Sequence, residues 1–303
     1  MKIAISTSSF ASVDSSPLTL LKAKGVEIVN NPFGRKLTEI EIINHLMGVD
    51  GLLAGLEPLN ANVFQRSPQL KAIARVGIGM DNVDIRAAEE NGIKLSNTPD
   101  GPTEAVAEMT LAAALLLVRN IGKANEALHN KQWEKSIGRG LKNAVVLIVG
   151  YGRIGRKVAD LFRVMGSKIL VCDPFVNKKD LHYGEELLEL QNGLQSADII
   201  TLHASGDKPI LTAVEFEIMT KGVIVLNSAR ANLIEEKALI TALDSNKVSS
   251  AWLDVFWKEP YFGKLSAYHQ VLLTPHMSTY SVQCRKDMEM AAVNNILRDL
   301  ESK

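Results

Sequence analysis

The 303-residue chain is long enough for about two domains, and its 46% hydrophobic and 22% charged residues are ordinary for a globular enzyme. Its 34 acidic residues balance 34 basic ones, so no global field attracts nucleic acid or an anionic membrane surface. Two cysteines, Cys172 and Cys284, are too few for a disulfide framework or a cysteine metal cluster, which favours a reduced, cytoplasmic protein with no metal site. The N-terminus lacks a signal-peptide core, and the most apolar run, Met109 to Val118, is too short to span a bilayer.

The first hundred residues alternate short apolar strands with helical patterns, which predicts βαβ units and a parallel sheet. The expected strands are Ile3 to Ser6, Val26 to Val29, Gly51 to Ala54 and Ala72 to Arg75. A glycine-bearing loop follows the fourth strand. Ligands of open α/β sheets bind at the carboxyl ends of strands, so Val76 to Gly79 could offer backbone N–H groups to an anion, or could form a plain turn.

The segment Asn97 to Pro102 is dense in turn residues and predicts the hinge between two domains. Beyond it the pattern predicts one long helix from Thr103 to about His129, started by a proline in a permitted first-turn position. This helix is more apolar than one face requires, so we expect a second subunit to cover part of it. The polar, glycine-bearing segment Lys131 to Lys142, which carries Trp133, predicts an arm.

The most specific pattern in the chain runs from Asn143 to Asp173. The apolar run Val145 to Val149 is typical of a buried parallel strand, and it ends in the glycine turn Gly150 to Gly155, with the pattern GxGxxG. The first glycine of such a turn permits the bend, the second lets backbone N–H groups approach a pyrophosphate, and the third lets the next helix pack on the strand. Asp173 ends the second strand about 20 residues further on, where it can accept hydrogen bonds from a ribose. The segment therefore predicts a Rossmann-like dinucleotide site.

After Asp173 further apolar strands are expected, each followed by polar residues. The strands are Ala197 to Leu202, Gly222 to Leu226, Ser250 to Leu253 and Val271 to Leu273. If they share a sheet with Val145 to Val149, their carboxyl ends converge on the cofactor cleft. Arg230, Glu259 and His276 would then gather there.

An arginine, an acid and a histidine are the groups that reduction of a 2-oxo acid needs. A guanidinium binds a carboxylate, an imidazolium donates a proton, and a carboxylate beside the imidazole favours its protonated form. Each residue also has a plainer interpretation: Arg230 as an ion pair, Glu259 as a solvated acid and His276 as a structural histidine. His203 competes with His276 for the acid role, but it has no equally placed acid following a strand.

In order and spacing, these motifs resemble those of the D-2-hydroxyacid dehydrogenase family over nearly the whole chain. The matching segments are Ala74 to Asp84, Gly150 to Gly155, Asn227 to Arg230, Asp254 to Phe256 with Glu259-Pro260, and Thr274 to His276. Within the family, the chain is most similar to short-form D-3-phosphoglycerate dehydrogenases. The resemblance implies NAD-dependent interconversion of a small D-2-hydroxy acid and its 2-oxo acid, with 3-phosphoglycerate as one candidate and glyoxylate or hydroxypyruvate as the alternative.

The resemblance also implies an α/β fold of two Rossmann-like or flavodoxin-like domains with parallel sheets. The cofactor domain, residues 99–282, would be inserted into a discontinuous substrate domain formed by residues 1–98 and 283–303. A homodimer joined through the long helix and the arm is implied as well. Neither nucleic acid nor a membrane is expected as a partner.

Residue roles follow from the same resemblance. Arg230 is assigned to the substrate carboxylate and carbonyl, His276 to acid/base chemistry, and Glu259 to the support of that histidine. Gly77 and Ile78 are expected to face the substrate. The expected NAD contacts are Gly150, Gly152, Arg153, Ile154, Gly155, Asp173, Ala204, Ser228, Ala229 and Asp254.

Some features depart from the family pattern. Many phosphoglycerate dehydrogenases carry an Arg-Ser pair where this chain has Gly55-Leu56, so either Arg139 of the arm binds a substrate phosphate or the substrate is unphosphorylated. The loop Ala204 to Pro209 is shorter than usual. No regulatory module follows Lys303, so feedback through one is not expected. A non-catalytic, NAD(H)-sensing corepressor is the alternative of a different class, and Glu259 argues against a formate dehydrogenase, which has a glutamine there.

Overall fold

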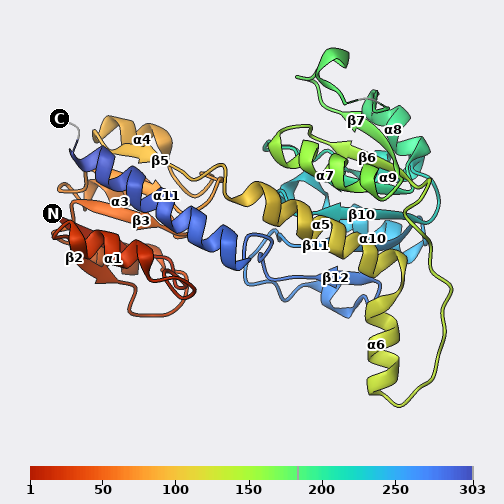
Figure 1. Cartoon of the computed structure of the whole chain (residues 1–303), viewed down its shortest axis with the longest axis horizontal. Coiled ribbons are helices and arrows are strands. Elements are labelled where there is room, and N and C mark those ends of the chain that lie inside the picture. The colour runs from red at the N-terminus through yellow and green to blue at the C-terminus, as the bar shows by residue number, and fades with distance from the viewer. Residues whose placement is uncertain (183, 302–303) are drawn as a thin grey trace. The chain divides into compact units, whose positions relative to one another are not determined.

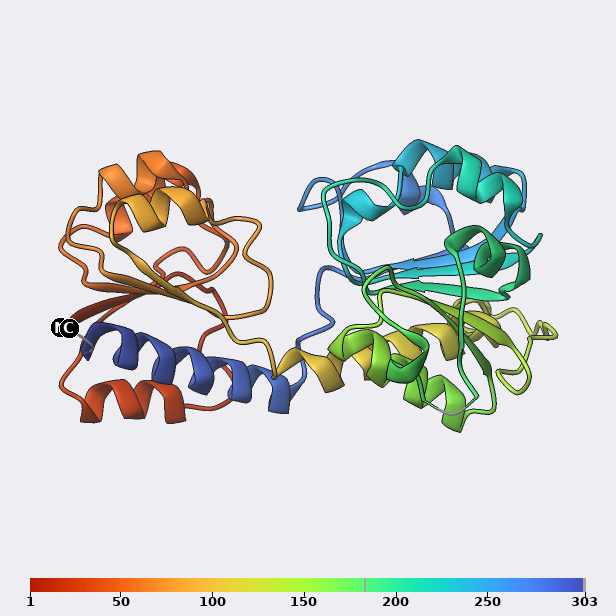
Figure 2. The ribbon, with the colours of Figure 1, turned by 90° about the horizontal axis from the view of Figure 1, so that it is seen from above.

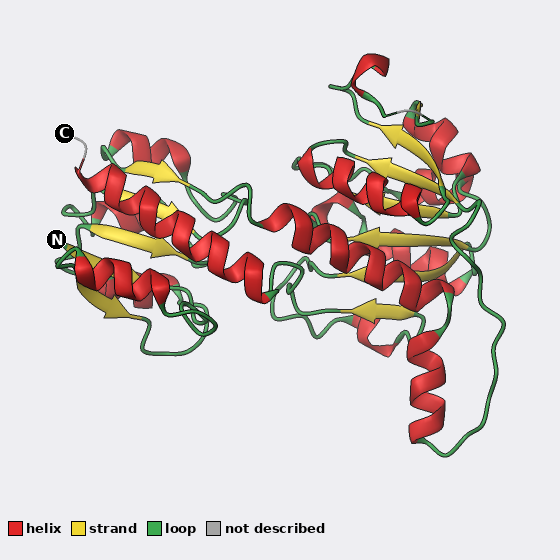
Figure 3. Cartoon of the chain, viewed as in Figure 1, coloured by secondary structure: helices red, strands yellow, loops and turns green. Residues whose placement is uncertain are grey.

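The computed structural model describes residues 1–182 and 184–301, and it divides the chain into two compact units (Figure 1). The first unit comprises Met1–Pro102 together with the segment from Tyr280 onward, and the second comprises Thr103–Thr279. The boundaries expected from the sequence were 98/99 and 282/283. Residues 302 and 303 of the expected returning segment lie outside the described residues. Both units alternate strands with helices (Figure 3).

The first unit is built on a five-stranded parallel sheet of order β2-β1-β3-β4-β5. Its strands are β1 (Lys2–Ile5), β2 (Glu27–Asn30), β3 (Gly51–Ala54), β4 (Ala72–Arg75) and β5 (Lys94–Ser96). Its helices are α1 (Ser16–Ala23), α2 (Glu39–His45), α3 (Ala61–Gln65), α4 (Ile85–Glu90) and α11 (Val282–Glu301).

Helices cover both faces of this sheet (Figure 2). Buried residues of α2, α3 and α4, among them Ile42, Phe64 and Ala88, form one core with β3 and β4. On the other face α11 packs against β3, β4 and β5, and α1 packs against α11. Because helices cover both faces of the sheet, β3 and β4 are buried along their whole length, and all their residues are apolar or glycine except Arg75 at the end of β4.

The second unit is built on a seven-stranded parallel sheet of order β12-β11-β10-β9-β6-β7-β8. Its strands are β6 (Val145–Val149), β7 (Lys168–Cys172), β8 (Glu186–Leu187), β9 (Ile199–Leu202), β10 (Val223–Asn227), β11 (Val248–Leu253) and β12 (Val271–Leu273). Its helices are α5 (Pro102–Val118), α6 (Ile121–His129), α7 (Arg153–Val164), α8 (Leu190–Ser196), α9 (Ala213–Ile218) and α10 (Glu236–Asp244), with the short 3₁₀ helices η1 (Lys178–Asp180), η2 (Ala231–Leu233) and η3 (Lys264–Ala267).

Two cores flank the second sheet. One is formed with α5 and α7, and the other with α8, α9 and α10. The register aligns the last residues of five neighbouring strands: Val149, Leu202, Asn227, Leu253 and Leu273. The residues that follow them therefore lie side by side along one edge. The prediction of two parallel-sheet α/β domains is confirmed.

The prediction of one helix from Thr103 to His129 is wrong. Two helices, α5 and α6, occupy this range and are bent by 63° relative to each other. Asn120 lies between them with φ +54°, a left-handed conformation that asparagine tolerates better than most residues. The arm then returns to the end of α5, where the Arg139 N–H donates to the Val118 carbonyl at 2.7 Å.

Among the described residues, no single helix has the length and apolarity to cross a membrane. Only when α5 and α6 are taken together, despite the bend between them, do their length and composition match those of a membrane span.

A buried ion pair within α11 generates a stability prediction. Arg285 Nη2 and Glu289 Oε1 are 2.6 Å apart, with only 8% and 2% of their side chains exposed, and Glu289 Oε2 also accepts the Ala11 N–H at 2.8 Å. Glu289→Ala should destabilise the first unit by about 3–5 kcal/mol, because removal of one partner leaves a buried charge unpaired. Hydrogen exchange of the β1, β3 and β4 amides reports the first unit by itself.

The matched control is Glu90→Ala. Glu90 forms the same i,i+4 pair with Arg86 at 2.9 Å, but the two side chains are 61% and 89% exposed. Exposed pairs contribute little, so amide protection should stay at the wild-type level. Equal effects of the two substitutions would contradict the argument from burial.

Candidate active site

The glycine turn after β6 has the packing that a dinucleotide site requires. Gly150 adopts φ +93°, and a Cβ there would lie 2.5 Å from the Ala204 nitrogen. A Cβ at Gly155 would overlap the Gly150 carbonyl oxygen, so the first and third glycines are required by close backbone contacts. No described atom lies within 4 Å of a Cβ built at Gly152, which leaves open space beside the N-terminus of α7. Such a space with backbone N–H groups fits a phosphate.

Asp173 is held rigidly at the end of β7. One carboxylate oxygen accepts the Tyr151 N–H at 2.7 Å and the other accepts the Phe175 N–H at 2.9 Å. Each carboxylate oxygen can accept more than one hydrogen bond, so the group retains capacity for ribose hydroxyls. These contacts join the acid directly to the glycine turn.

Tyr151, within that turn, belongs to a network that the sequence analysis missed. Its hydroxyl donates to Glu185 Oε2, and the Arg156 guanidinium carbon lies 4.5 Å from the ring centroid. Burial and the neighbouring Glu185 carboxylate raise the pKa of Tyr151 above its ordinary value, so the phenol stays protonated. The only sequence signal was an aromatic residue at the second position of the turn.

The loop after β10 is fixed by a buried asparagine. Asn227 is 1% exposed; its Oδ1 accepts the Ala229 N–H at 3.0 Å and its Nδ2 donates to the Arg230 carbonyl at 2.9 Å. The Arg230 Nη1 donates to the Ala229 carbonyl at 2.8 Å. Among the described residues the buried Ser228 Oγ has no hydrogen-bond partner. An orphaned hydroxyl at this edge is what a missing ligand group would leave, so it fits a bound cofactor.

His276 and Glu259 form a hydrogen-bonded pair. The histidine Nδ1 lies 3.1 Å and 3.0 Å from the two carboxylate oxygens of Glu259. Glu259 Oε1 also accepts the Phe256 N–H at 3.1 Å, which orients the carboxylate. The two side chains remain 41% and 31% exposed. With Nδ1–H donating to Glu259, the imidazole keeps Nε2 available for a substrate.

Asp254 holds the loop that carries His276. It is fully buried, and its carboxylate accepts hydrogen bonds from Thr274 Oγ1 at 2.6 Å, from the Met277 and Ser278 N–H groups at 2.9 Å each, and from Ser278 Oγ at 2.5 Å. Trp252 Nε1 donates to the same threonine hydroxyl at 2.9 Å. The resemblance assigned Asp254 to the cofactor. The structure adds its contacts with the histidine loop, which an acid directly after a buried strand could have signalled.

His203, the alternative proton donor, has the wrong properties for that role. Although part of the residue reaches the surface, desolvation of the ring lowers its pKa to about 3. Thr201 Oγ1 lies 2.8 Å from His203 Nε2. The ring is therefore neutral at physiological pH and already hydrogen-bonded.

Gly77 and Ile78 belong to the first unit, at the end of β4. Gly77 has φ +145°, and its N–H donates to Thr98 Oγ1 at 2.8 Å. The Ile78 carbonyl accepts Asn97 Nδ2 at 2.8 Å. The Gly77 N–H is therefore already hydrogen-bonded within the protein and is not available to bind an anion.

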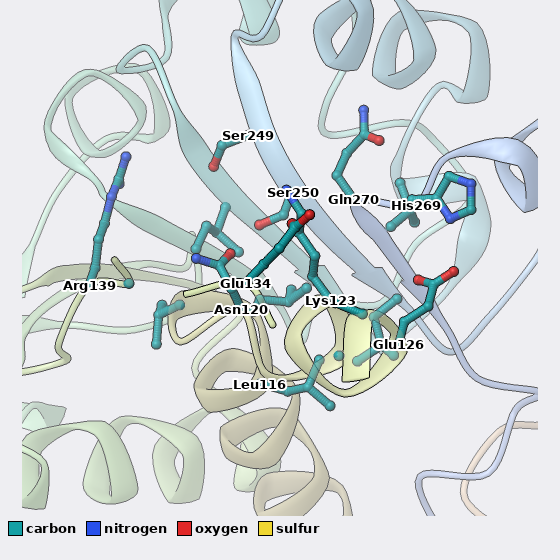
Figure 4. A pocket seen from close by; sticks show the side chains of 18 of the residues that line it. Leu116, Asn120, Lys123, Glu126, Glu134, Arg139, Ser249, Ser250, His269 and Gln270 are labelled. Atoms are coloured by element: carbon teal, nitrogen blue, oxygen red, sulfur yellow. The ribbon is translucent and has the colours of Figure 1, made fainter. Parts of the chain in front are cut away.

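A hollow of about 910 Å³ lies at the opposite edge of the second sheet, between α6, the arm and the amino ends of β11 and β12 (Figure 4). Arg139 lines it, and Arg139 Nη2 lies 3.1 Å from a Cβ built at Gly222, directly before β10. Arg230 lies three residues beyond the other end of β10. The length of the strand separates the two arginines, so Arg139 does not serve the site of its own chain.

One group of described residues has metal-ligand geometry: Asp160, His182 and Glu185, with ligand atoms within 4.8 Å of one another. His182 Nδ1 is 3.0 Å from Asp160 Oδ1, and the His182 N–H donates to Glu185 Oε2 at 2.8 Å. These hydrogen bonds account for the arrangement without an ion.

Comparisons with known proteins agree with this geometry. A family model described as D-isomer specific 2-hydroxyacid dehydrogenase, NAD binding domain, matches residues 111–278. The D-3-phosphoglycerate dehydrogenase of Synechocystis sp. is 34% identical over 265 residues, which are 84% of this chain and 48% of that protein. The chain thus spans about half the length of the curated phosphoglycerate dehydrogenases that it matches.

The hydroxypyruvate reductase of Thermotoga maritima is 32% identical over 274 residues, covering 87% of this chain and 89% of that protein. The crystal structure of the TT0316 protein from Thermus thermophilus superposes with a TM-score of 0.90 at 30% identity, over 99% of this chain and 97% of that one. With a matching NAD-binding domain and relatives aligned over most of its length, this chain belongs to the D-isomer specific 2-hydroxyacid dehydrogenase family.

Proposed function

We propose that the protein interconverts a small D-2-hydroxy acid and its 2-oxo acid with NAD(H). The observation that carries this proposal is the bond between His276 and Glu259, on the edge of the sheet that also holds Arg230 and the glycine turn. Ligands of doubly wound sheets bind at the point where the strand order reverses, which here lies between β6 and β9. When bound, the nicotinamide supplies or accepts the hydride.

The side chains divide the remaining work. Arg230 binds the substrate carboxylate and polarises the ketone, since its planar guanidinium matches a carboxylate in two hydrogen bonds. His276 donates a proton to the ketone oxygen during reduction and takes one from the hydroxyl during oxidation. Glu259 orients the imidazole and stabilises its charged form. Asp254 and Asn227 hold the loops that carry these groups.

We assign the cofactor contacts on the same edge. The open space at the start of α7 suits the pyrophosphate. The residues around it are Gly150, Gly152, Arg153, Ile154 and Gly155. Asp173 receives the adenosine ribose. The residues that follow β9, β10 and β11 lie nearer to His276 and Glu259 and would contact the nicotinamide half. They are Ala204, Ser228, Ala229 and Asp254. In the first unit, Gly77 and Ile78 would face the substrate.

The proposed assembly is a homodimer joined through α6 and the arm. Large apolar side chains there are exposed: Ile121 is 52% exposed, Leu128 54%, Trp133 81% and Ile137 101%. Ile137 also lines the hollow between α6, the arm and β11. Exposed apolar surface of this kind marks an association site. We also propose a cytoplasmic location, and expect neither nucleic acid nor a membrane as a partner of a chain with zero net charge.

The first prediction concerns the cofactor. Wild-type protein should use NAD(H) in preference to NADP(H), because the Asp173 carboxylate would repel a 2′-phosphate and accept from free ribose hydroxyls. Asp173→Ala should reduce that preference. The measurement is kcat/KM for both cofactors in both proteins, and equal use of the two by the wild type would rule the assignment out.

The second prediction concerns proton transfer. His276→Ala should lower kcat by about 10² to 10⁴-fold while NADH affinity stays nearly intact. Glu259→Gln should lower kcat by a smaller factor, since the amide oxygen can still accept the Nδ1–H but carries no charge beside the imidazole. The matched control is His203→Asn, which removes a neutral imidazole and should preserve kcat. A near-normal kcat in His276→Ala would show that another group transfers the proton.

The third prediction concerns the dimer. Trp133→Ser combined with Ile137→Ser should convert the protein to a monomer, as measured by light scattering, because it removes apolar area from the association surface. Val164→Ser, which alters an 83% exposed residue on α7, is the control and should leave the mass unchanged. A monomeric wild type would contradict the assembly.

A further inference from the structure

The segment that connects β11 to η3 carries Glu259, so its conformation decides where that carboxylate lies. It comprises residues 254–263 and follows β11 at the carboxyl edge of the second sheet. The side chains of Glu259 and His276 are 31% and 41% exposed. Pairs with this much contact with water contribute little by themselves, so the bond between the two does not suffice to hold the carboxylate in place. Other contacts of the segment must do so.

Two stacked aromatic rings close the turn that carries Glu259. The ring centroids of Phe256 and Tyr261 are 4.6 Å apart, and their planes are inclined by only 22°. A stacked pair at this distance is favourable, and both rings also pack against the core that the sheet forms with α8, α9 and α10. Glu259 lies between them in the chain, and its Oε1 accepts the Phe256 N–H at 3.1 Å. The stack therefore joins the two ends of the turn.

Tyr261 is itself anchored to α10. Its hydroxyl donates to Oε1 of Glu236, the first residue of α10, at 2.6 Å and accepts the Leu265 N–H at 3.1 Å. Burial and the Glu236 carboxylate raise the pKa of Tyr261 to about 12, so the phenol stays protonated and remains the donor. Because α10 packs against β11, contacts run from the sheet through α10 and Tyr261 to the turn that carries Glu259.

Two further residues support this arrangement. A Cβ built at Gly263 would lie 2.4 Å from both Cζ and the hydroxyl oxygen of Tyr261, so the glycine leaves the room that the tyrosine ring occupies. Trp257 donates its indole N–H to the Ile234 carbonyl, shortly before α10, at 2.9 Å. The turn is therefore attached to the region around the start of α10 on both sides of Glu259.

We propose that Tyr261 is a positioning residue that holds Glu259 against His276, with Glu236 as its anchor. Tyr261 acts through Glu259, and the rate of proton transfer depends on it because displacement of a reacting group by about 1 Å can cost about 10²-fold in rate. This inference rests on the proposed function, since it assumes that His276 and Glu259 carry out the proton transfer.

The test measures kcat for reduction of a 2-oxo acid by NADH, together with the Kd of NADH. Tyr261→Leu removes the stack and the hydroxyl, so it should lower kcat by about 10-fold while the Kd of NADH stays near the wild-type value. Tyr261→Phe keeps the stacked ring and should retain most of the wild-type kcat. Phe256→Leu removes the other ring of the stack and should lower kcat as Tyr261→Leu does.

A second background separates positioning from a general structural role. In Glu259→Ala there is no carboxylate left to position, so the addition of Tyr261→Leu should lower kcat no further. A structural defect that acts independently of Glu259 would lower kcat in both backgrounds by the same factor.

Tyr268→Leu is the matched control. Tyr268 packs against the same core, and its hydroxyl donates to Oδ1 of Asp244 at 2.9 Å, but Asp244 is the last residue of α10. Its substitution should leave kcat unchanged.

Four results would overturn the inference while wild-type turnover left the proposed function intact. They are an unchanged kcat in both Tyr261→Leu and Phe256→Leu, a loss of NADH affinity that accompanies the loss of kcat in both, an equal loss of kcat in Tyr268→Leu, and a further loss of kcat when Tyr261→Leu is added to Glu259→Ala. Absence of wild-type turnover with hydroxypyruvate, phosphohydroxypyruvate and glyoxylate would overturn the proposed function as well.

Discussion

The parallel register of the second sheet is the constraint on which the candidate active site depends. Five neighbouring strands end in alignment, at Val149, Leu202, Asn227, Leu253 and Leu273. Each strand delivers the next residues of the chain to the same edge, so groups more than a hundred residues apart in sequence meet without long connections. The apolar cores on both faces fix this alignment, because a shift of one strand by one residue would turn its side chains to the opposite face.

The alignment of the strands does not by itself fix the conformations of the loops that follow them. Buried polar side chains at the strand ends restrain these loops. The Asn227 side chain bonds to the backbone of both Ala229 and Arg230. Asp254 accepts four hydrogen bonds from the segment that contains His276, and that histidine has a left-handed backbone, with φ +52°. A strained conformation persists only where its surroundings hold it. The proposed catalytic groups thus lie on loops that a second layer of residues ties to the sheet.

Much of this was predictable from the sequence, for identifiable reasons. Apolar runs with turns between them predicted the strands, and the glycine turn predicted the packing of Gly150 and Gly155 because those contacts depend on the backbone alone. The break at Asn120 was missed because the apolar pattern continues through it and its left-handed backbone leaves no periodic signal. The hydrogen bonds of Tyr151 and Glu57 were missed too. Both depend on partners distant in sequence, Glu185 and Ser6, which only the folded chain brings near.

The discontinuity of the first unit affects the order in which the protein folds on the ribosome. Its core includes α11, which packs against β3, β4 and β5 although the whole second unit separates them in the chain. The second unit is continuous and can complete its core as soon as it has emerged. At about 5–20 residues per second, the N-terminal strands wait on the order of ten seconds or more for their last helix, with one face of the sheet uncovered. Until α11 has emerged, the newly made chain therefore exposes the apolar face of this sheet that α11 covers in the folded protein.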